Sequence, residues 1–394
     1  MLGRTLAMVV CAWGVATTAT ASTLLFSPEG NRLNVYDVDT LPVAKRTLIQ
    51  GYADAPEDPA SRDINGQICF RKQDGEVVFI SGEDTVGAAG GGSHAERIAG
   101  WGVFELTGDT LATLSATQVG KLNPTYLGDP DNFGCGFLPD GRLVTTAIGN
   151  VNPGEVANGE LIMWFPPLDV PQPTDGDGNR LPSTNFCKLD TGIPTTGGVY
   201  VDGETIYVAS NRPNDGNGEP SGVWKFTPGE GGYPTAPNAA GGCSGNDGKD
   251  GPLVDAGRVE KEIFVPNYPV PLPADPFSLT PSSVVESNWG TFFVSSVFTG
   301  TIAEYDAAGN FLRWVMAPPF GGQGIGITPF GLAVDRRDGT LYVADLGIVA
   351  VTPVPMNGSV ARIRFVTDLY VPLPPEPIDL LLTFPDGLGV ITFD

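Results

Sequence analysis

Short apolar runs, broken by turns that contain glycine, repeat along this chain of 394 residues. The stretch GLAVDRRDGTLYVAD (331–345) shows the unit, because two apolar runs flank an Asp-Gly pair and the second run ends on a carboxylate. A tight hairpin turn needs a positive φ, which glycine adopts without steric cost. The pattern therefore predicts a β-hairpin at 331–345.

Five more stretches combine an apolar strand, a turn containing glycine and a second apolar strand. They are 69–81, 136–147, 198–210, 284–296 and 381–393. A repeat of about 40–50 residues with four strands is the size of a propeller blade. The turn glycines are spaced by 66, 62, 87, 49 and 48 residues, and they are Gly75, Gly141, Gly203, Gly290, Gly339 and Gly387.

Outer strands are expected at 222–228, 300–315 and 359–366. The hairpin at 381–393 has no room for outer strands, whereas 23–49 has strands but no inner hairpin before it. We therefore predict an all-β fold, a six-bladed β-propeller with four-stranded blades. Strands from both termini close the ring, two of them from the C-terminus, so that no sheet edge is left open. A β-solenoid or a pair of sandwiches is the alternative.

Long turn-rich insertions near 166–185 and 228–252 predict surface loops on a single propeller domain, 22–394. The 53 glycines and 36 prolines also fit disordered sequence, but a hydrophobic fraction of 41% and regular strands favour a packed fold. Tryptophans recur at intervals close to the blade repeat and are expected to pack between blades. They are Trp101, Trp164, Trp224, Trp289 and Trp314.

The first 21 residues have the pattern of a secretory signal peptide. Arg4 precedes an apolar run, and Ala-Thr-Ala (19–21) is a small-residue cleavage signal. We expect a secreted or periplasmic protein with no transmembrane segment. The formal net charge of −23, from 45 acidic and 22 basic residues, disfavours nucleic acid and anionic membranes as partners.

Four cysteines remain after residues 1–21, and an even number in an exported chain favours disulfides. Three pairings are possible. Cys69 and Cys135 both lie on strands that lead into an Asp-Gly turn, and Cys187 and Cys243 bracket one blade, so 69–135 and 187–243 are preferred. The absence of a CxxCH motif argues against haem, and no nucleotide is expected.

The stretches TPFGLAVDRRDGTLYVAD (328–345) and GSVARIRF (358–365) together resemble an NHL-type repeat. More broadly, the chain resembles the six-bladed superfamily that includes SMP-30/gluconolactonase and paraoxonase-like lactonases. The resemblance implies a divalent cation, often calcium, at one end of the central channel. Asn, Asp and Glu side chains at the ends of the inner strands would hold it.

The candidate calcium ligands are Asn65, Asn132, Asn211 and Asp345, with Asp63, Glu83 and Asp131 as reserves. The alternative is that these residues cap turns and bind backbone amides. The acidic stretch DGDGN (175–179) lacks the later residues of a calcium loop and is better explained as a turn.

Three classes of function remain open. The first is an exported propeller that binds a small molecule or a protein partner at the channel mouth. The second is a calcium-dependent lactonase or esterase, for which His94, the only histidine, is the weak candidate for a general base. The third is a structural or assembly component of an extracellular or envelope complex. The set of acid–base groups is poor, so catalysis is doubtful and oligomeric state stays open.

Overall fold

The computed structural model describes residues 22–29, 32–50, 62–85, 98–123, 132–148, 159–171, 173, 175–177, 181, 183–210, 222–237, 253, 257–266, 281–297, 299–317, 328–346, 358–366, 370–380, 385 and 387–393. These residues form 26 β-strands and contain no α-helix.

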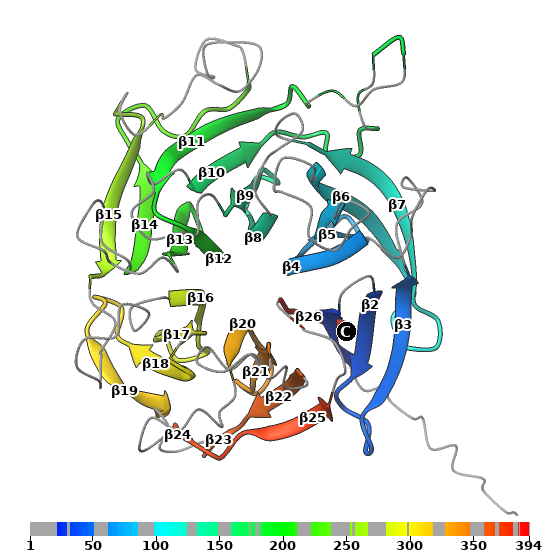
Figure 1. Cartoon of the computed structure of the whole chain (residues 1–394), viewed down its shortest axis with the longest axis vertical. Helices are drawn as coiled ribbons and strands as arrows, with labels where there is room; N and C mark the ends of the chain where they lie inside the picture. The colour runs from blue at the N-terminus through cyan, green and yellow to red at the C-terminus, as the bar shows by residue number, and fades with distance from the viewer. Residues whose placement is uncertain are drawn as a thin grey trace, which may run out of the picture.

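Six four-stranded antiparallel sheets surround a central axis as the blades of a propeller (Figure 1). The predicted six-bladed propeller is therefore confirmed. The inner strands, which lie nearest the axis, are β4 (Arg62–Gln73), β8 (Asn132–Phe137), β12 (Thr196–Asp202), β16 (Pro281–Glu286), β20 (Pro329–Val334) and β26 (Gly389–Phe393), and they begin blades 1 to 6 in that order.

The remaining strands follow outward within each blade. Blade 1 continues with β5 (Glu76–Thr85), β6 (Ile98–Thr107) and β7 (Ser115–Leu122), and blade 2 with β9 (Leu143–Ala147), β10 (Gly159–Trp164) and β11 (Phe186–Ile193). Blade 3 continues with β13 (Thr205–Ser210), β14 (Gly222–Pro228) and β15 (Val259–Val265), and blade 4 with β17 (Phe292–Ser296), β18 (Thr301–Tyr305) and β19 (Phe311–Met316).

Blade 5 continues with β21 (Leu341–Asp345), β22 (Ser359–Ile363) and β25 (Glu376–Leu380), and blade 6 with β1 (Ser22–Pro28), β2 (Arg32–Asp37) and β3 (Ala44–Gln50). Between β22 and β25 the chain forms a short two-stranded ribbon from β23 (Phe365–Val366) and β24 (Val371–Pro372).

Five of the six predicted turn glycines occupy tight turns between an inner strand and its neighbour, and all five have a positive φ of 57° to 87°. They are Gly75, Gly141, Gly203, Gly290 and Gly339. Neighbouring inner strands meet at equivalent positions, since a Cβ on Gly134 would contact Gly197 and a Cβ on Gly197 would contact Ser282. The inner strands therefore run in the same direction, and these turns lie on one face of the ring, named here the turn face.

Blade 6, which closes the ring, differs from the prediction in the number of strands that each end of the chain supplies. The C-terminus supplies one strand, β26, and the N-terminus supplies three, with Leu24 opposite Ile391 in the β1–β26 register. The predicted two-strand contribution of 381–393 is thus wrong. Gly387 lacks a positive φ, and a Cβ there would clash with the Gly66 carbonyl oxygen. This glycine serves a close approach to blade 1 and not a hairpin turn.

The hydrophobic core is divided among the contacts between blades. Each of the six core clusters among the described residues joins two neighbouring blades, including blades 6 and 1. The predicted packing of tryptophans between blades is confirmed, because Trp101 and Trp164 are fully buried between blades 1 and 2. The two predicted insertions lie in the β10–β11 and β14–β15 connections.

Candidate functional site

Three of the four predicted calcium ligands have a described backbone, and they lie away from the turn face. Asn65 lies near the start of β4 and Asn132 begins β8, whereas Asp345 ends β21 opposite Pro329. The side chains of Asn65 and Asn132 and the whole of Asn211 lie outside the described residues. The weak catalytic candidate His94, Cys243 and the side chains of the reserve residues Asp63, Glu83 and Asp131 also lie outside them.

Asp345 is the one predicted ligand whose side chain is described, and it is 6% exposed. Its Oδ1 accepts hydrogen bonds from the Thr328 backbone N–H (2.7 Å) and hydroxyl (3.0 Å), and its Oδ2 accepts one from the Ser359 hydroxyl (3.0 Å). The carboxylate therefore ties together three segments of blade 5. Within the described ranges, no group of three or more His, Cys, Asp or Glu side chains could hold a metal ion, so the calcium site stays a prediction.

A disulfide joins Cys69 of β4 to Cys135 of β8 and links the inner strands of blades 1 and 2. This is one of the two pairings that the sequence favours. Cys187 is disulfide-bonded too. Cys243, its expected partner, lies in a segment that the structure does not describe.

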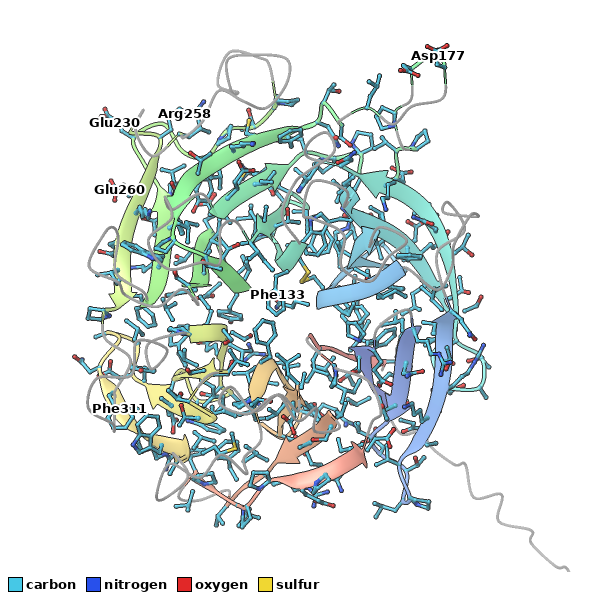
Figure 2. The ribbon with its side chains drawn as sticks, in the orientation of Figure 1. Phe133, Asp177, Glu230, Arg258, Glu260 and Phe311 are labelled. Carbon is cyan, nitrogen blue, oxygen red and sulfur yellow. A yellow bond between two sulfur atoms is a disulfide. The ribbon has the colours of Figure 1, made fainter. Side chains whose placement is uncertain are left out.

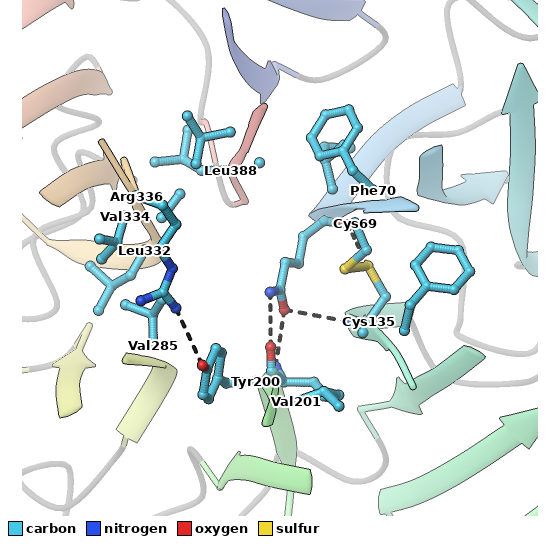
Figure 3. Close-up of a pocket in the computed structure, with 18 residues that line it drawn as sticks. Cys69, Phe70, Cys135, Tyr200, Val201, Val285, Leu332, Val334, Arg336 and Leu388 are labelled. Atoms are coloured by element: carbon cyan, nitrogen blue, oxygen red, sulfur yellow. Dashed lines mark hydrogen bonds between the residues drawn. A yellow bond between two sulfur atoms is a disulfide. The ribbon is translucent and has the colours of Figure 1, made fainter. Parts of the chain in front are cut away.

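A cavity of about 340 Å³ occupies the half of the channel next to the turn face, and all six inner strands contribute to it (Figure 3). We name it the channel well. Its accessible wall is divided almost evenly between polar and apolar atoms, and the disulfide forms part of one side. The aliphatic side chains come from Val201, Val285, Leu332, Val334, Leu388 and Val390.

Two aromatic rings close the channel on the side of the well away from the turn face. Phe133 of β8 and Phe330 of β20 meet edge to face, with ring centroids 4.4 Å apart. Their blades, 2 and 5, stand on opposite sides of the ring, and Figure 2 shows Phe133 near the centre. Because both residues lie near the start of an inner strand, the pair spans the channel above the well.

Gln67 of β4 reaches past blade 2 to blade 3 and strengthens this closed end. Its amide N–H donates to the Val199 carbonyl (2.8 Å), and its oxygen accepts from the Val199 N–H (3.0 Å) and the Cys135 N–H (3.4 Å). The side chain thus satisfies backbone groups that an inner strand would otherwise leave unpaired at the channel. It fixes three neighbouring inner strands to one another.

The open end of the well carries three polar side chains from three successive blades. The Tyr200 hydroxyl donates to Glu286 Oε2 (2.6 Å) and accepts from an Arg336 N–H (3.2 Å). Arg336 also donates to the Ser287 carbonyl (3.1 Å), and its guanidinium lies 5.8 Å from the centroid of the Tyr200 ring. Burial, followed by the hydrogen bond to Glu286, raises the pKa of Tyr200 above its ordinary value.

The sequence also contains a signal for the closed end, and it lies outside the hairpin turns. Five inner strands carry a register shift against the next strand. In four of them the shift runs from the first residue to the third or fourth, and in β4 it runs from Asn65 to Cys69. A bulge of this kind redirects a side chain, and bulges are common near functional sites. Phe-Gly at 133–134 and at 330–331 occupies equivalent places in two of these bulges, so the repeated dipeptide marks the two rings that meet.

No protein-family model and no curated protein matches this chain. Its structure is similar to a chain of the nidogen/laminin complex, at 12% identity and a TM-score of 0.48, covering 93% of this chain and 98% of that one. A putative gluconolactonase has 12% identity and a TM-score of 0.40, covering 82% and 89%. Virginiamycin B lyase from Staphylococcus aureus has 11% identity and a TM-score of 0.41, covering 93% and 92%.

These likenesses are too distant to carry an argument about function, which must come from the site itself. The fold and the site define a six-bladed propeller whose channel is closed at one end and forms a well at the other. In the part of the chain that the structure describes, no helix is long and apolar enough to cross a membrane.

Proposed function

We propose that this protein is an exported propeller that binds a small molecule in the channel well and does not catalyse a reaction on it. The observation that carries the proposal is the well itself. Its volume of about 340 Å³ falls within the range of about 300–1,000 Å³ that is usual for small-molecule sites.

The chemistry of the walls supports binding. Small-molecule sites combine apolar walls with a few placed polar groups, and the well combines apolar side chains with Gln67 at one end and Arg336 at the other. The Cys69–Cys135 disulfide and the hydrogen bonds of Gln67 hold the inner strands in place. A rigid, preformed site loses little entropy when a ligand binds.

Export is part of the proposal and rests on two observations. Residues 1–21 have the pattern of a signal peptide. The Cys69–Cys135 disulfide is compatible with an oxidising compartment outside the cytoplasm.

Ligand-observed NMR against a library of small metabolites tests the binding proposal. The wild type is compared with Val285→Phe, which fills the well, and with Val366→Phe, which makes the same change at an exposed position on β23. We expect ligands that bind the wild type and Val366→Phe but not Val285→Phe. Equal binding by all three proteins, or no ligand at all, would overturn the proposal.

The hydrolase and structural-component alternatives find less support. Lactonase chemistry would need the calcium site, and the two oxygens of Asp345 already accept hydrogen bonds within blade 5. A structural role would need a docking surface, for which the described residues give no specific argument. The channel well, in contrast, has a defined volume and defined polar ends.

A further inference from the structure

Arg336 is the charged residue that lines the channel well, and it stands in the turn between β20 and β21. Its side chain is 49% exposed, so solvent and ligands reach it. A guanidinium carries five N–H donors. Among the described residues, Arg336 donates two hydrogen bonds, to the Ser287 carbonyl and to the Tyr200 hydroxyl. Donors therefore remain for a group that enters the well.

The guanidinium is held before a ligand arrives. The groups that accept its two hydrogen bonds lie on blades 3 and 4, and the Tyr200 ring lies beneath the guanidinium. Among the described residues Glu286 supplies the carboxylate that pairs with Arg336, yet its Oε2 lies 3.9 Å away and accepts its short hydrogen bond from Tyr200 instead. Tyr200 thus keeps the acidic group from taking the remaining N–H donors of Arg336. A fixed fork of N–H groups suits bidentate binding of a carboxylate.

The rest of the well offers a mixed polar and apolar surface to the body of a ligand. Val285, Leu332 and Val334 form the wall beside Arg336 (Figure 3). At the closed end, the Gln67 oxygen already accepts two hydrogen bonds from backbone N–H groups, so it needs no further donor from a ligand. The volume of about 340 Å³ lies near the lower end of the range that is usual for small-molecule sites, so the body of the ligand must be compact.

We propose that the ligand of the channel well is a compact monocarboxylate whose carboxylate pairs with Arg336 at the mouth and whose body lies against the mixed polar and apolar interior. This assignment rests on the proposed binding function and names the ligand class for the same site. The net charge of −23 does not favour an anion in general, so the selectivity must come from Arg336 locally.

Calorimetric titration with two isosteric probes tests the assignment. The probes are the compact pair 3-phenylpropionate and 3-phenylpropanamide, and only the first carries a carboxylate. We expect the acid to bind the wild type at least tenfold more tightly than the amide. Arg336→Gln should reduce the affinity for the acid to that for the amide. Arg336→Lys keeps the charge but loses the fork and should give an intermediate value.

Arg364→Gln is the matched control, because Arg364 has a similarly exposed side chain but lies outside the well and pairs with Glu376. It should leave both affinities unchanged, and thermal melts verify that each variant is folded. Equal binding of acid and amide, or an unchanged acid affinity in Arg336→Gln, overturns the carboxylate assignment and leaves the binding function intact. Binding of neither probe also overturns the assignment, and the Val285→Phe library experiment then decides the binding function separately.

Discussion

At the scale of single residues, polar side chains hold neighbouring strands together. Asp345 accepts three hydrogen bonds from Thr328 and Ser359, and Gln67 pairs with the backbone of Val199. The sequence predicted Asp345 as a strand-end residue but could not reveal its partners, because Thr328 and Ser359 come beside it only when β20, β21 and β22 pair. Gln67 escaped notice because its partner lies 132 residues away.

Replacing Asp345 by alanine removes the acceptor of three hydrogen bonds at a buried position. Leaving buried donors without a partner costs about 1–3 kcal/mol each, less what water recovers. We expect Asp345→Ala to lower the free energy of unfolding by about that amount when urea denaturation is measured in a chelator.

The comparison of Asp345→Asn with the wild type in added calcium tests the metal prediction. A metal that binds only the folded state stabilises it. Calcium that raises the melting temperature of the wild type but not of Asp345→Asn would support the axial site. Equal melting temperatures with calcium and with chelator would leave Asp345 as a residue that caps strand ends.

The Cys69–Cys135 disulfide should contribute strongly to stability, because it closes a loop across 66 residues. The chain-entropy relation gives about 4 kcal/mol for a loop of that length. We expect the double variant Cys69→Ala, Cys135→Ala to lose up to this amount in urea denaturation under non-reducing conditions. A loss below about 1 kcal/mol would show that the unfolded chain is already restricted in this region.

At the scale of elements, the hairpins were predictable from the sequence and the bulges were not. The apolar runs and the Asp-Gly turn depend only on residues that are close together in the sequence. They therefore predicted the β4–β5 and β20–β21 hairpins. A bulge depends on how closely the next inner strand approaches. Gly134 lies in one such place, where a Cβ would be 2.5 Å from the Gly197 carbonyl oxygen. The same reasoning explains Gly387, which the pattern wrongly made a turn.

Gly387→Ala should therefore destabilise the contact between blades 6 and 1. The added Cβ would meet backbone atoms of Gly66, which cannot move as a flexible side chain can. Overpacking of this kind costs about 1–3 kcal/mol or more, and urea denaturation measures it. Gly176→Ala is the control, because a Cβ there meets nothing within 4 Å. Equal stability of the two variants would contradict the close-approach role of Gly387.

At the scale of the whole molecule, the repeat predicted the number of blades, and the unpartnered ends predicted that the termini close the ring. The number of strands that each end contributes could not be predicted from the sequence, because the stretch 381–393, which contains β26, has the same pattern as a true hairpin. The channel well could not be predicted either, since it collects residues from six inner strands and exists only after the ring forms. The calcium site was predicted at the opposite end of the same channel.

An ion pair also joins blade 5 to blade 6, the blade in which the two ends of the chain meet. Arg337 donates to both oxygens of Asp39 (2.8 and 3.1 Å) and to Asp335, and it thereby ties the β20–β21 turn to the β2–β3 turn. Burial raises the pKa of Asp39, but the hydrogen bonds from Arg337 and from the Thr23 backbone N–H, with the charge of Arg337, outweigh it and leave the pKa below its ordinary value.

A carboxyl group whose pKa is lower in the folded state stabilises that state above its unfolded pKa, about 3.9 for Asp. The contribution is lost as the pH falls below that value towards the folded pKa. We therefore expect the wild type to lose more stability between pH 7 and pH 3, measured by urea denaturation, than Asp39→Asn loses. The control Asp177→Asn, at an exposed position far out on the β10–β11 connection (Figure 2), should behave as the wild type. An equal loss in the wild type and in Asp39→Asn would mean that the contact between blades 5 and 6 depends on its apolar core and not on this ion pair.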